Sequence, residues 1–537
     1  MRQKSIKTAL TPLLSAVLLA FSITVAAQEN PDDYVLLNSL LKDNPKTSIF
    51  YSALEATHLT DSISKFIDYT YPQPQFDSTY ACLELTGTVA IHYSTGYQNY
   101  ENGQYQRVVW PEQRLFKYTV FVVNDSVLQR VYGIRTLNDL RAKARTVYPE
   151  GASLDDSDIN SSLYKLMSYH ILPCWLPRHL LNYTDRYVIN DYMNACPDSI
   201  DMADFYETLH PYAIMRISTP YDRATGYNGK YAFINRKGTV SAGNLEAEGI
   251  RIWNPRESAG DWSSMEAVNG GYHYIDSLLL FNQATKNALH TRIRVMSTTL
   301  SPDFINSGAR GRMRQTLGNI PTTFAVYSFK NGFCKNVTIN NSQTMFAVRY
   351  QDREWDCYYD EEITIRGLFD ITFRLPPVPE SGLYEIRVSG VAASEPRFRD
   401  MNGTVLYYIR KGNQEYVPCN TPVDLTLFPT DPRIGYISDL DLLDSESSLE
   451  NDNAMRKRGY MKAPDSFAKG SGIGDRMRNH ENCYRKIVCE IYMEAGQDYY
   501  LRLRQLSGDL SSLLPLNYIE IVPYSIYSGQ NGPEDKH

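Results

Sequence analysis

The spacing of apolar residues predicts that the first part of the chain mixes helices with strands. Apolar residues recur three and four positions apart over 34–41 and 48–66, which predicts short helices. Asn124 and Asp125 stand where the cap of a third helix belongs, and a fourth should run through Leu163 until Pro173 ends it. Period-two or continuous apolar runs predict strands at 83–93, 106–110, 118–123, 231–234, 249–253 and 272–280.

From about Leu289 the pattern is almost wholly that of β-strands. Such short runs, separated by Gly and Pro, favour a mostly antiparallel β-sandwich of the jelly-roll kind. The runs are 292–296, 324–329, 346–350, 363–375, 384–388, 405–409, 488–493, 499–503 and 518–522. Within this region 439–453 is acidic and 456–458 is basic. Because charge runs usually face water, they predict a surface excursion with a solvated helix.

Composition and charge exclude several classes of protein. The chain has 537 residues, of which 43% are hydrophobic and 21% are charged, so it is long enough for two to four folded domains and too apolar for a disordered protein. Eight Cys are too few for a disulfide scaffold. The net charge of -7 provides no basic surface for phosphates, so we expect no nucleic acid as a partner.

The first residues have the pattern of a signal peptide. A positive stretch with Arg2, Lys4 and Lys7 precedes an apolar run, and cleavage is expected after Ala27, which gives a leader over 1–27. The protein is therefore predicted to be exported to the periplasm, the outer-membrane surface or the medium. A lipoprotein is not expected, because Gln28 follows the cleavage site. No later run reaches 18 apolar residues, so no transmembrane helix is expected after removal of the leader.

No motif in the chain indicates catalysis, a cofactor or a metal. The nine His include no H-x-H or H-E-x-x-H pattern, and there is no P-loop and no Gly-x-Ser-x-Gly elbow. The acidic cluster at 360–362 does not reveal whether two carboxylates would face each other, as a glycosidase requires. Cysteine pairing stays open: Cys489 alternates with Ile487 and Ile491 as a core residue would, so both a disulfide and a buried free thiol are compatible with the sequence.

Four segments of the first region together resemble the fasciclin family of extracellular adhesion modules. They are 50–61 (FYSALEATHLTD), 119–128 (TVFVVNDSVL), 166–173 (LMSYHILP) and 269–280 (NGGYHYIDSLLL). Val122 and Val123 depart from the Ala and Pro that are usual in the second of these. The resemblance implies an α+β domain over 28–283 that binds rather than catalyses.

The fasciclin motif includes Asn124, Asp125, Tyr169, His170 and His273, for which we expect a structural role. The Tyr-His pair has been linked to adhesion in this family. At the end of an apolar helix, however, a hydrogen-bonded core histidine is the favoured interpretation of His170.

The second region, 284–528, resembles galactose-binding-like β-sandwiches, and a disordered tail is expected over 529–537. The resemblance is carried by 375–388, which matches a P-x-x-G-x-Y strand entry, and by 499–504 with 517–523, which match the closing pair. If the region binds a glycan, Trp355 with Asp356, Tyr358 and Tyr359 is the segment that concentrates aromatic and polar groups. The alternative is that Trp355 or Tyr359 fills the core.

The sequence therefore predicts an exported, non-enzymatic adhesion or binding protein of the cell envelope, of the kind found in Gram-negative bacteria. Its expected partner is an extracellular or cell-surface glycan or protein. A carbohydrate-active enzyme, or an accessory protein of a glycan-utilisation system, is the alternative, and a purely structural envelope protein is a third. Asp-Ser-aliphatic triplets resemble O-glycosylation acceptors of some Gram-negative anaerobes, and Ser62 and Ser199 are the favoured candidates.

Overall fold

The computed structural model describes most of the chain after the leader. The described residues are 35–71, 80–86, 89–101, 104–111, 113–181, 202–219, 232–235, 238–241, 244–247, 249–253, 265–310, 326–350, 361–391, 401–464, 477–481 and 483–529. The leader, Ser199, the segment from Gln351 to Asp360 and most of the expected tail lie outside these ranges. No helix in the described ranges has the length and apolar character needed to cross a bilayer.

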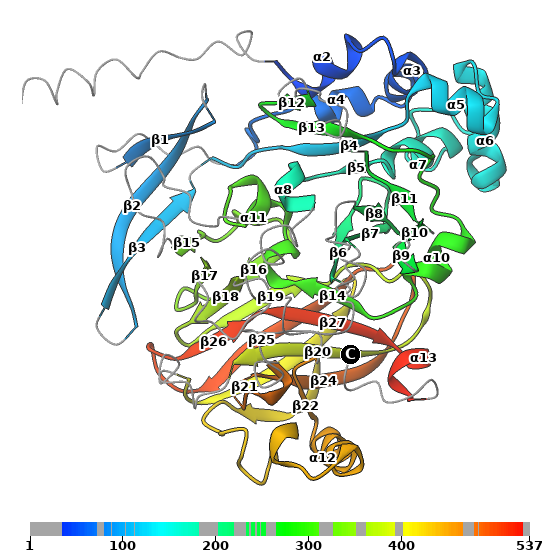
Figure 1. Ribbon diagram of the computed structural model, residues 1–537. Coiled ribbons are helices and arrows are strands. Elements are labelled where there is room, and N and C mark those ends of the chain that lie inside the picture. The colour runs from blue at the N-terminus through cyan, green and yellow to red at the C-terminus, as the bar shows by residue number, and fades with distance from the viewer. Residues whose placement is uncertain are drawn as a thin grey trace, which may run out of the picture. The chain divides into compact units, whose positions relative to one another are not determined.

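The described chain is a mixed α/β fold rich in antiparallel sheet, and its helices gather in the first region (Figure 1). These helices are α2 (Leu37–Lys42), α3 (Ser48–Ala56), α4 (Leu59–Ile63), α5 (Asp125–Tyr132), α6 (Leu137–Val147), α7 (Ser162–Ser168) and α8 (Arg178–Leu181). The predicted helix starting near Asn124 is confirmed, because the Asn124 side chain accepts a hydrogen bond from the Val127 N–H at 2.9 Å.

The helices surround a small sheet that brings distant segments of the first region together. In it β4 (Tyr118–Val122) pairs in parallel with β13 (Gly270–Tyr274) and antiparallel with β5 (Ile171–Leu172), and β12 (Glu266–Ala267) lies at the edge. A second sheet has the order β11 (Ile250–Arg251), β8 (Phe233–Ile234), β7 (Ile214–Thr219) and β6 (Met202–Glu207). A separate hairpin is formed by β9 (Gly238–Ser241) and β10 (Asn244–Ala247).

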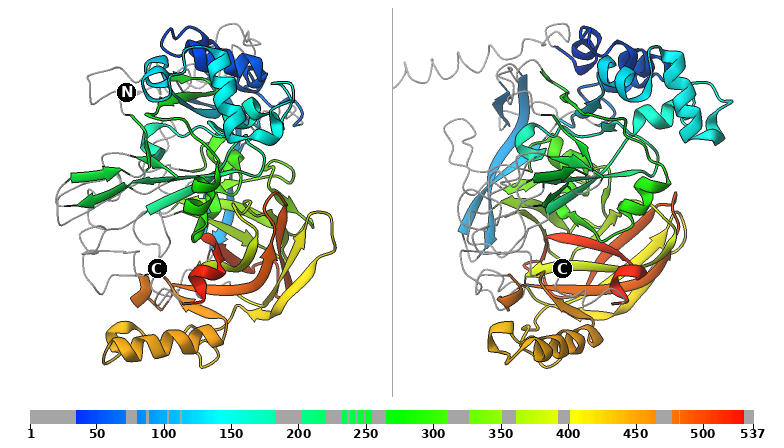
Figure 2. Two further views of the ribbon diagram at one scale, coloured as in Figure 1. Left: turned by 90° about the vertical axis from the view of Figure 1, so that its right-hand side faces the viewer. Right: turned by 45° about the vertical axis from the view of Figure 1, so that its right-hand side comes forward.

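Two five-stranded antiparallel sheets form the centre of the second region, in an arrangement compatible with a β-sandwich (Figure 2). The first has the order β14 (Ile293–Met296), β27 (Tyr518–Pro523), β20 (Gly382–Val391), β24 (Cys483–Met493) and β23 (Tyr460–Lys462). The second has the order β16 (Val337–Ile339), β19 (Asp370–Arg374), β25 (Tyr499–Ser507), β21 (Thr404–Lys411) and β22 (Val417–Asp424).

A seven-stranded sheet contains strands from both regions. Its order is β1 (Tyr80–Thr86), β2 (Val89–Glu101), β3 (Gln104–Pro111), β15 (Val326–Ser328), β17 (Met345–Tyr350), β18 (Glu361–Arg366) and β26 (Leu513–Leu516). The remaining helices are α10 (Gln283–Leu289), α11 (Pro302–Asn306), α12 (Ser445–Lys457) and α13 (Tyr524–Tyr527).

Two expected strands are shorter than the sequence pattern predicted. The run at 363–375 is divided into β18 and β19, because Gly367 adopts a φ of +90° and its Cβ position would lie 2.0 Å from the Gln343 carbonyl oxygen. The run at 272–280 ends as β13 at Tyr274.

Candidate functional site

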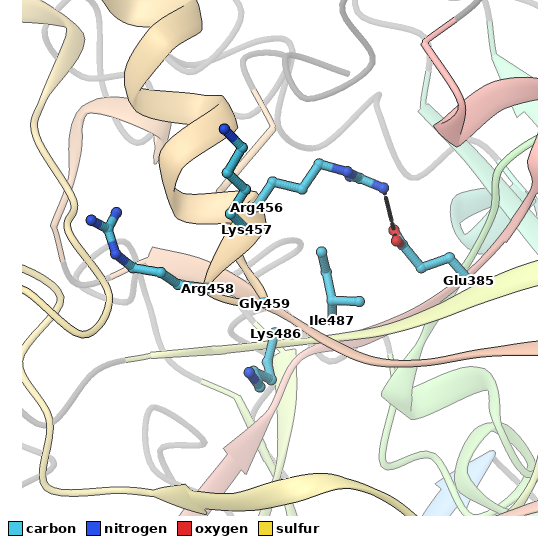
Figure 3. Close-up of a pocket in the computed structure, with 7 residues that line it drawn as sticks. All are labelled: Glu385, Arg456, Lys457, Arg458, Gly459, Lys486 and Ile487. Carbon is cyan, nitrogen blue, oxygen red and sulfur yellow. Dashed lines mark hydrogen bonds and ion pairs between the residues drawn. The ribbon is translucent and has the colours of Figure 1, made fainter.

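A pocket of about 520 Å³ with a cationic lining lies where the end of α12 meets strands β20 and β24 of the first five-stranded sheet (Figure 3). We call it the cationic pocket. Its lining residues are Glu385, Arg456, Lys457, Arg458, Gly459, Lys486 and Ile487. They come from β20, from the end of α12 and the turn after it, and from β24. Four cations and one carboxylate give the lining a formal charge of +3.

The sequence of α12 explains why its basic end is held at the pocket. The helix starts with a capping box in which the Asp444 carboxylate accepts from the Ser447 N–H at 2.9 Å. Ser448, Asn451, Asp452 and Met455 are its buried residues. Arg456 and Lys457 lie in the last turn, where positive side chains interact favourably with the helix dipole.

Gly459 follows the end of α12 and is one of the residues that line the pocket. It adopts a φ of +80°, a left-handed conformation typical of the residue after a helix, and its N–H donates to the Arg456 carbonyl at 2.9 Å. A Cβ at this position would lie only 2.7 Å from the Lys486 Nζ. Its own carbonyl accepts from the Ile487 N–H at 3.0 Å. A side chain here would therefore displace Lys486 as well as strain the turn.

The Glu385 carboxylate pairs with Arg456 at the pocket and with the buried Arg387. Both oxygens of its carboxylate accept from the Arg456 Nη2, at 3.0 and 2.8 Å, and Oε1 also accepts from the Arg387 Nε at 2.5 Å. Arg387 is fully buried and pairs with the buried Glu520 at 3.2 Å. The one carboxylate of the pocket is thus already neutralised by two guanidinium groups.

Lys486 is a cation of the pocket that is partly removed from water. Burial lowers its pKa to about 8. Its Nζ lies 4.0 Å from the centre of the Tyr460 ring, a cation–π contact. Within the described part of the chain, no carboxylate forms an ion pair with Lys486, Lys457 or Arg458. An anion entering the pocket would therefore meet three ammonium or guanidinium groups that form no ion pair with any described carboxylate.

The backbone around the pocket does not oppose an anion strongly. The C-terminal end of a helix carries partial negative charge, because its last carbonyls lack partners within the helix. Here the carbonyls of Met455 and Arg456 accept from the N–H groups of Arg458 and Gly459, both at 2.9 Å. The side chains, rather than the backbone, would therefore determine the binding of a carboxylate, sulfate or phosphate group.

The sequence-predicted site residues lie elsewhere. Trp355, Asp356, Tyr358 and Tyr359 lie outside the described residues, so that candidate glycan site stays a prediction. Asp125 is the first residue of α5, and its carboxylate accepts from the N–H groups of Ser48 and Ile49, each at 3.1 Å. It therefore joins the start of α5 to the start of α3.

Tyr169, His170 and His273 are buried in the first region. The Tyr169 hydroxyl donates to the Ile214 carbonyl at 3.0 Å, and the His170 Nε2 accepts from the Leu279 N–H at 3.1 Å. Burial lowers the pKa of His170 to about 3, so the ring is neutral at ordinary pH. These contacts support the structural interpretation of the motif, and an adhesive role for the Tyr-His pair stays a prediction.

His273 is held in a similar way, since its Nε2 lies 2.8 Å from the Leu176 carbonyl oxygen and its ring stacks on Trp175. Burial lowers its pKa to about 4, and the hydrogen bond to that carbonyl raises it only in part. In the described ranges, no group of three or more His, Cys, Asp or Glu side chains is placed to hold a metal ion.

The cationic pocket was missed because its basic run was interpreted only as a solvated surface. Lys457 and Arg458 are indeed exposed, but Arg456 turns inward to Glu385. A signal was present: a basic triplet followed directly by Gly predicts a helix end with cations around a turn. The sequence matches no protein-family model and no curated protein.

Proposed function

We propose that this chain is an exported, non-enzymatic binding or adhesion protein, and that its second region binds an acidic glycan through the cationic pocket. The observation that carries the proposal is the +3 formal charge of the described lining residues, among which the single carboxylate, that of Glu385, is already paired. Carboxylate or sulfate groups on a sugar are the complementary chemistry.

The dimensions and exposure of the pocket suit a sugar unit carried by a longer chain. A volume of about 520 Å³ is within the usual range for sites of small ligands. Lys457 and Arg458 are exposed and would meet an acidic polymer first, whereas Lys486 lies deeper and is half-buried. Long-range attraction by the outer cations and short-range contact with the inner one would act in sequence.

The adhesive part of the proposal rests on the fasciclin-like segments of the first region. Three of the four segments meet in one sheet, because β4 pairs with both β5 and β13. The fourth contributes α3, which contacts α5 and α7. Residues that resemble family motifs are thus neighbours in space, which supports the resemblance. The fasciclin assignment is part of this proposal.

The proposal is tested by exchanging the two exposed cations. We expect the double variant Lys457→Ala/Arg458→Ala to bind immobilised heparin and polygalacturonate about tenfold more weakly than the wild type, because two charge contacts of about 0.5–1 kcal/mol each are lost. Neutral dextran should bind neither protein. Wild-type affinity should also fall as NaCl is raised from 50 to 500 mM, since exposed charges are screened.

A matched control is available in the first region. Lys42 and Arg145 are exposed basic residues in the last turns of α2 and α6, so Lys42→Ala/Arg145→Ala makes the same change of net charge at helix ends outside the pocket. Equal weakening by both double variants would contradict a specific site and indicate attraction by net charge alone. Depolymerisation of either polysaccharide would instead support the carbohydrate-active alternative.

A further inference from the structure

Two cysteines, one from each five-stranded sheet, flank the chain segment that contains α12 and β23. Cys419 lies on β22, where it pairs with Tyr407 of β21, and Cys489 lies on β24, where it pairs with Ile386 of β20. β22 and β24 contact each other across the sheets. The two side chains are hydrogen-bonded to each other, and both are free thiols in the structure.

The two thiols differ in exposure, and each shifts the pKa of the other. Cys419 is buried, with 5% of its surface exposed, whereas Cys489 is half-buried. The hydrogen bond from Cys489 lowers the pKa of Cys419, although burial acts in the opposite direction. The same contact, burial and the nearby Glu385 carboxylate raise the pKa of Cys489.

We propose that Cys419 and Cys489 are a redox pair that closes to an inter-sheet disulfide in an oxidising compartment. The two S–H bonds are broken and one Sγ–Sγ bond is formed. The two electrons and two protons pass to a disulfide oxidant such as oxidised glutathione, which is cleaved to two thiols. The step needs no ligand in the cationic pocket, so it does not depend on the glycan proposal.

The position of the pair determines what the disulfide would do. The chain between Cys419 and Cys489 contains α12, β23 and the turn at Gly459, so a bond between the two cysteines closes a loop around the whole pocket-bearing segment. A crosslink over a loop of this length restricts the unfolded chain strongly. Oxidation would therefore stabilise the edge of the sandwich on which the pocket is built.

The proposal is tested on the folded, purified protein. The protein is incubated with oxidised glutathione, denatured in acid, alkylated with N-ethylmaleimide and digested without reduction. Mass spectrometry should find a peptide pair joined through Cys419 and Cys489 that separates on reduction. Recovery of both cysteines as alkylated peptides after oxidation would overturn the proposal, whether or not any variant folds.

Variants then measure the effect of the bond. Oxidised wild type should melt about 2–5 °C above the reduced protein, and this difference should vanish in Cys419→Ser. The matched control is Cys483→Ser on the same strand β24, which should keep both the crosslink and the difference in melting temperature. A difference that persists in Cys419→Ser would also contradict the assignment.

Discussion

At the residue scale, the central feature is that Gly459 and Lys486 depend on each other. A Cβ at position 459 would lie 2.7 Å from the Lys486 Nζ, so glycine lets the Lys486 ammonium keep its present position. The ammonium in turn is kept partly out of water beside the Tyr460 ring. Desolvation disfavours its charged form, which makes Lys486 the group through which pH would act on anion binding.

The pH dependence has a definite sign. Because the pKa of Lys486 is lowered to about 8, the side chain is charged below pH 8 and loses its proton as the pH rises above it. We expect the affinity for heparin to fall about two- to tenfold between pH 7.5 and 9.5, measured by calorimetry at constant ionic strength. Lys486→Arg, which stays charged, should remove this dependence. Identical wild-type affinities at both pH values would exclude Lys486 from the site.

The same shift affects stability in the opposite direction from binding. An unfolded lysine titrates near pH 10.5, so between about pH 8 and 10.5 the unfolded chain holds more protons at this position than the folded chain. The contribution of Lys486 to stability therefore rises with pH over that range, while its contribution to anion binding falls. The two effects can be separated by measuring both.

At the element scale, α12 shows what the sequence predicts and what it does not. The acidic run followed by basic residues predicted a solvated helix, and a helix is present at 445–457. Its buried partners could not be predicted, because Lys462 and Arg478 reach Asp439 and Asp452 only after the chain has turned back on itself. Local patterns identify a helix and its caps, but they do not identify contacts between residues that are distant in the chain.

The same limit applies to the candidate site. Asn124 could be placed as a cap because the cap and its partner are three residues apart. In the cationic pocket, by contrast, Arg456 pairs with Glu385, which lies 71 positions earlier in the chain, on a sheet whose register the sequence does not reveal. The basic run at 456–458 could be identified in the sequence, but the ion pair that turns Arg456 toward Glu385 could not.

The buried ion pairs beneath α12 give a prediction for this element. Arg478 is buried, its Nε donates to Asp439 at 2.5 Å, and its Nη2 also donates to Asp452. Although burial acts to raise the pKa of Asp439, Lys462 and Arg478 lower it to about 2. We expect Arg478→Met to reduce the free energy of unfolding by about 2–4 kcal/mol in urea denaturation, because the buried Asp452 loses its shorter ion pair and keeps the longer one with Lys462, at 3.8 Å.

An exposed arginine is the control for that measurement. Arg433 pairs with Asp431 at 3.0 Å, but its side chain is 64% exposed and its charge is screened by water. Arg433→Met should therefore change stability little. If both variants are equally stable, the ion pairs of Arg478 do not hold α12 to the turn at Met477–Asn479.

At the scale of the whole molecule, the proposed boundary between 283 and 284 is crossed by backbone pairing and by charge. β15 pairs in parallel with β3 through Val326 opposite Val108 and Tyr327 opposite Val109. Arg374 of β19 forms ion pairs with Glu207 of β6 and with Asp498. The boundary was predicted from a change in local pattern, which does not report pairing between distant strands.

Separating the two regions would therefore expose an unpaired strand edge. In a fragment of 284–537, β15 loses its partner β3, and Arg374 loses Glu207. Unpaired edges promote association, so we expect this fragment to form oligomers in size-exclusion chromatography and to melt below the full chain. Coexpression with 28–283 should return it to a single complex that copurifies on a tag carried by either half. A fragment 284–537 that is monomeric and melts cooperatively at the temperature of the full chain would instead show that the second region folds independently of the first.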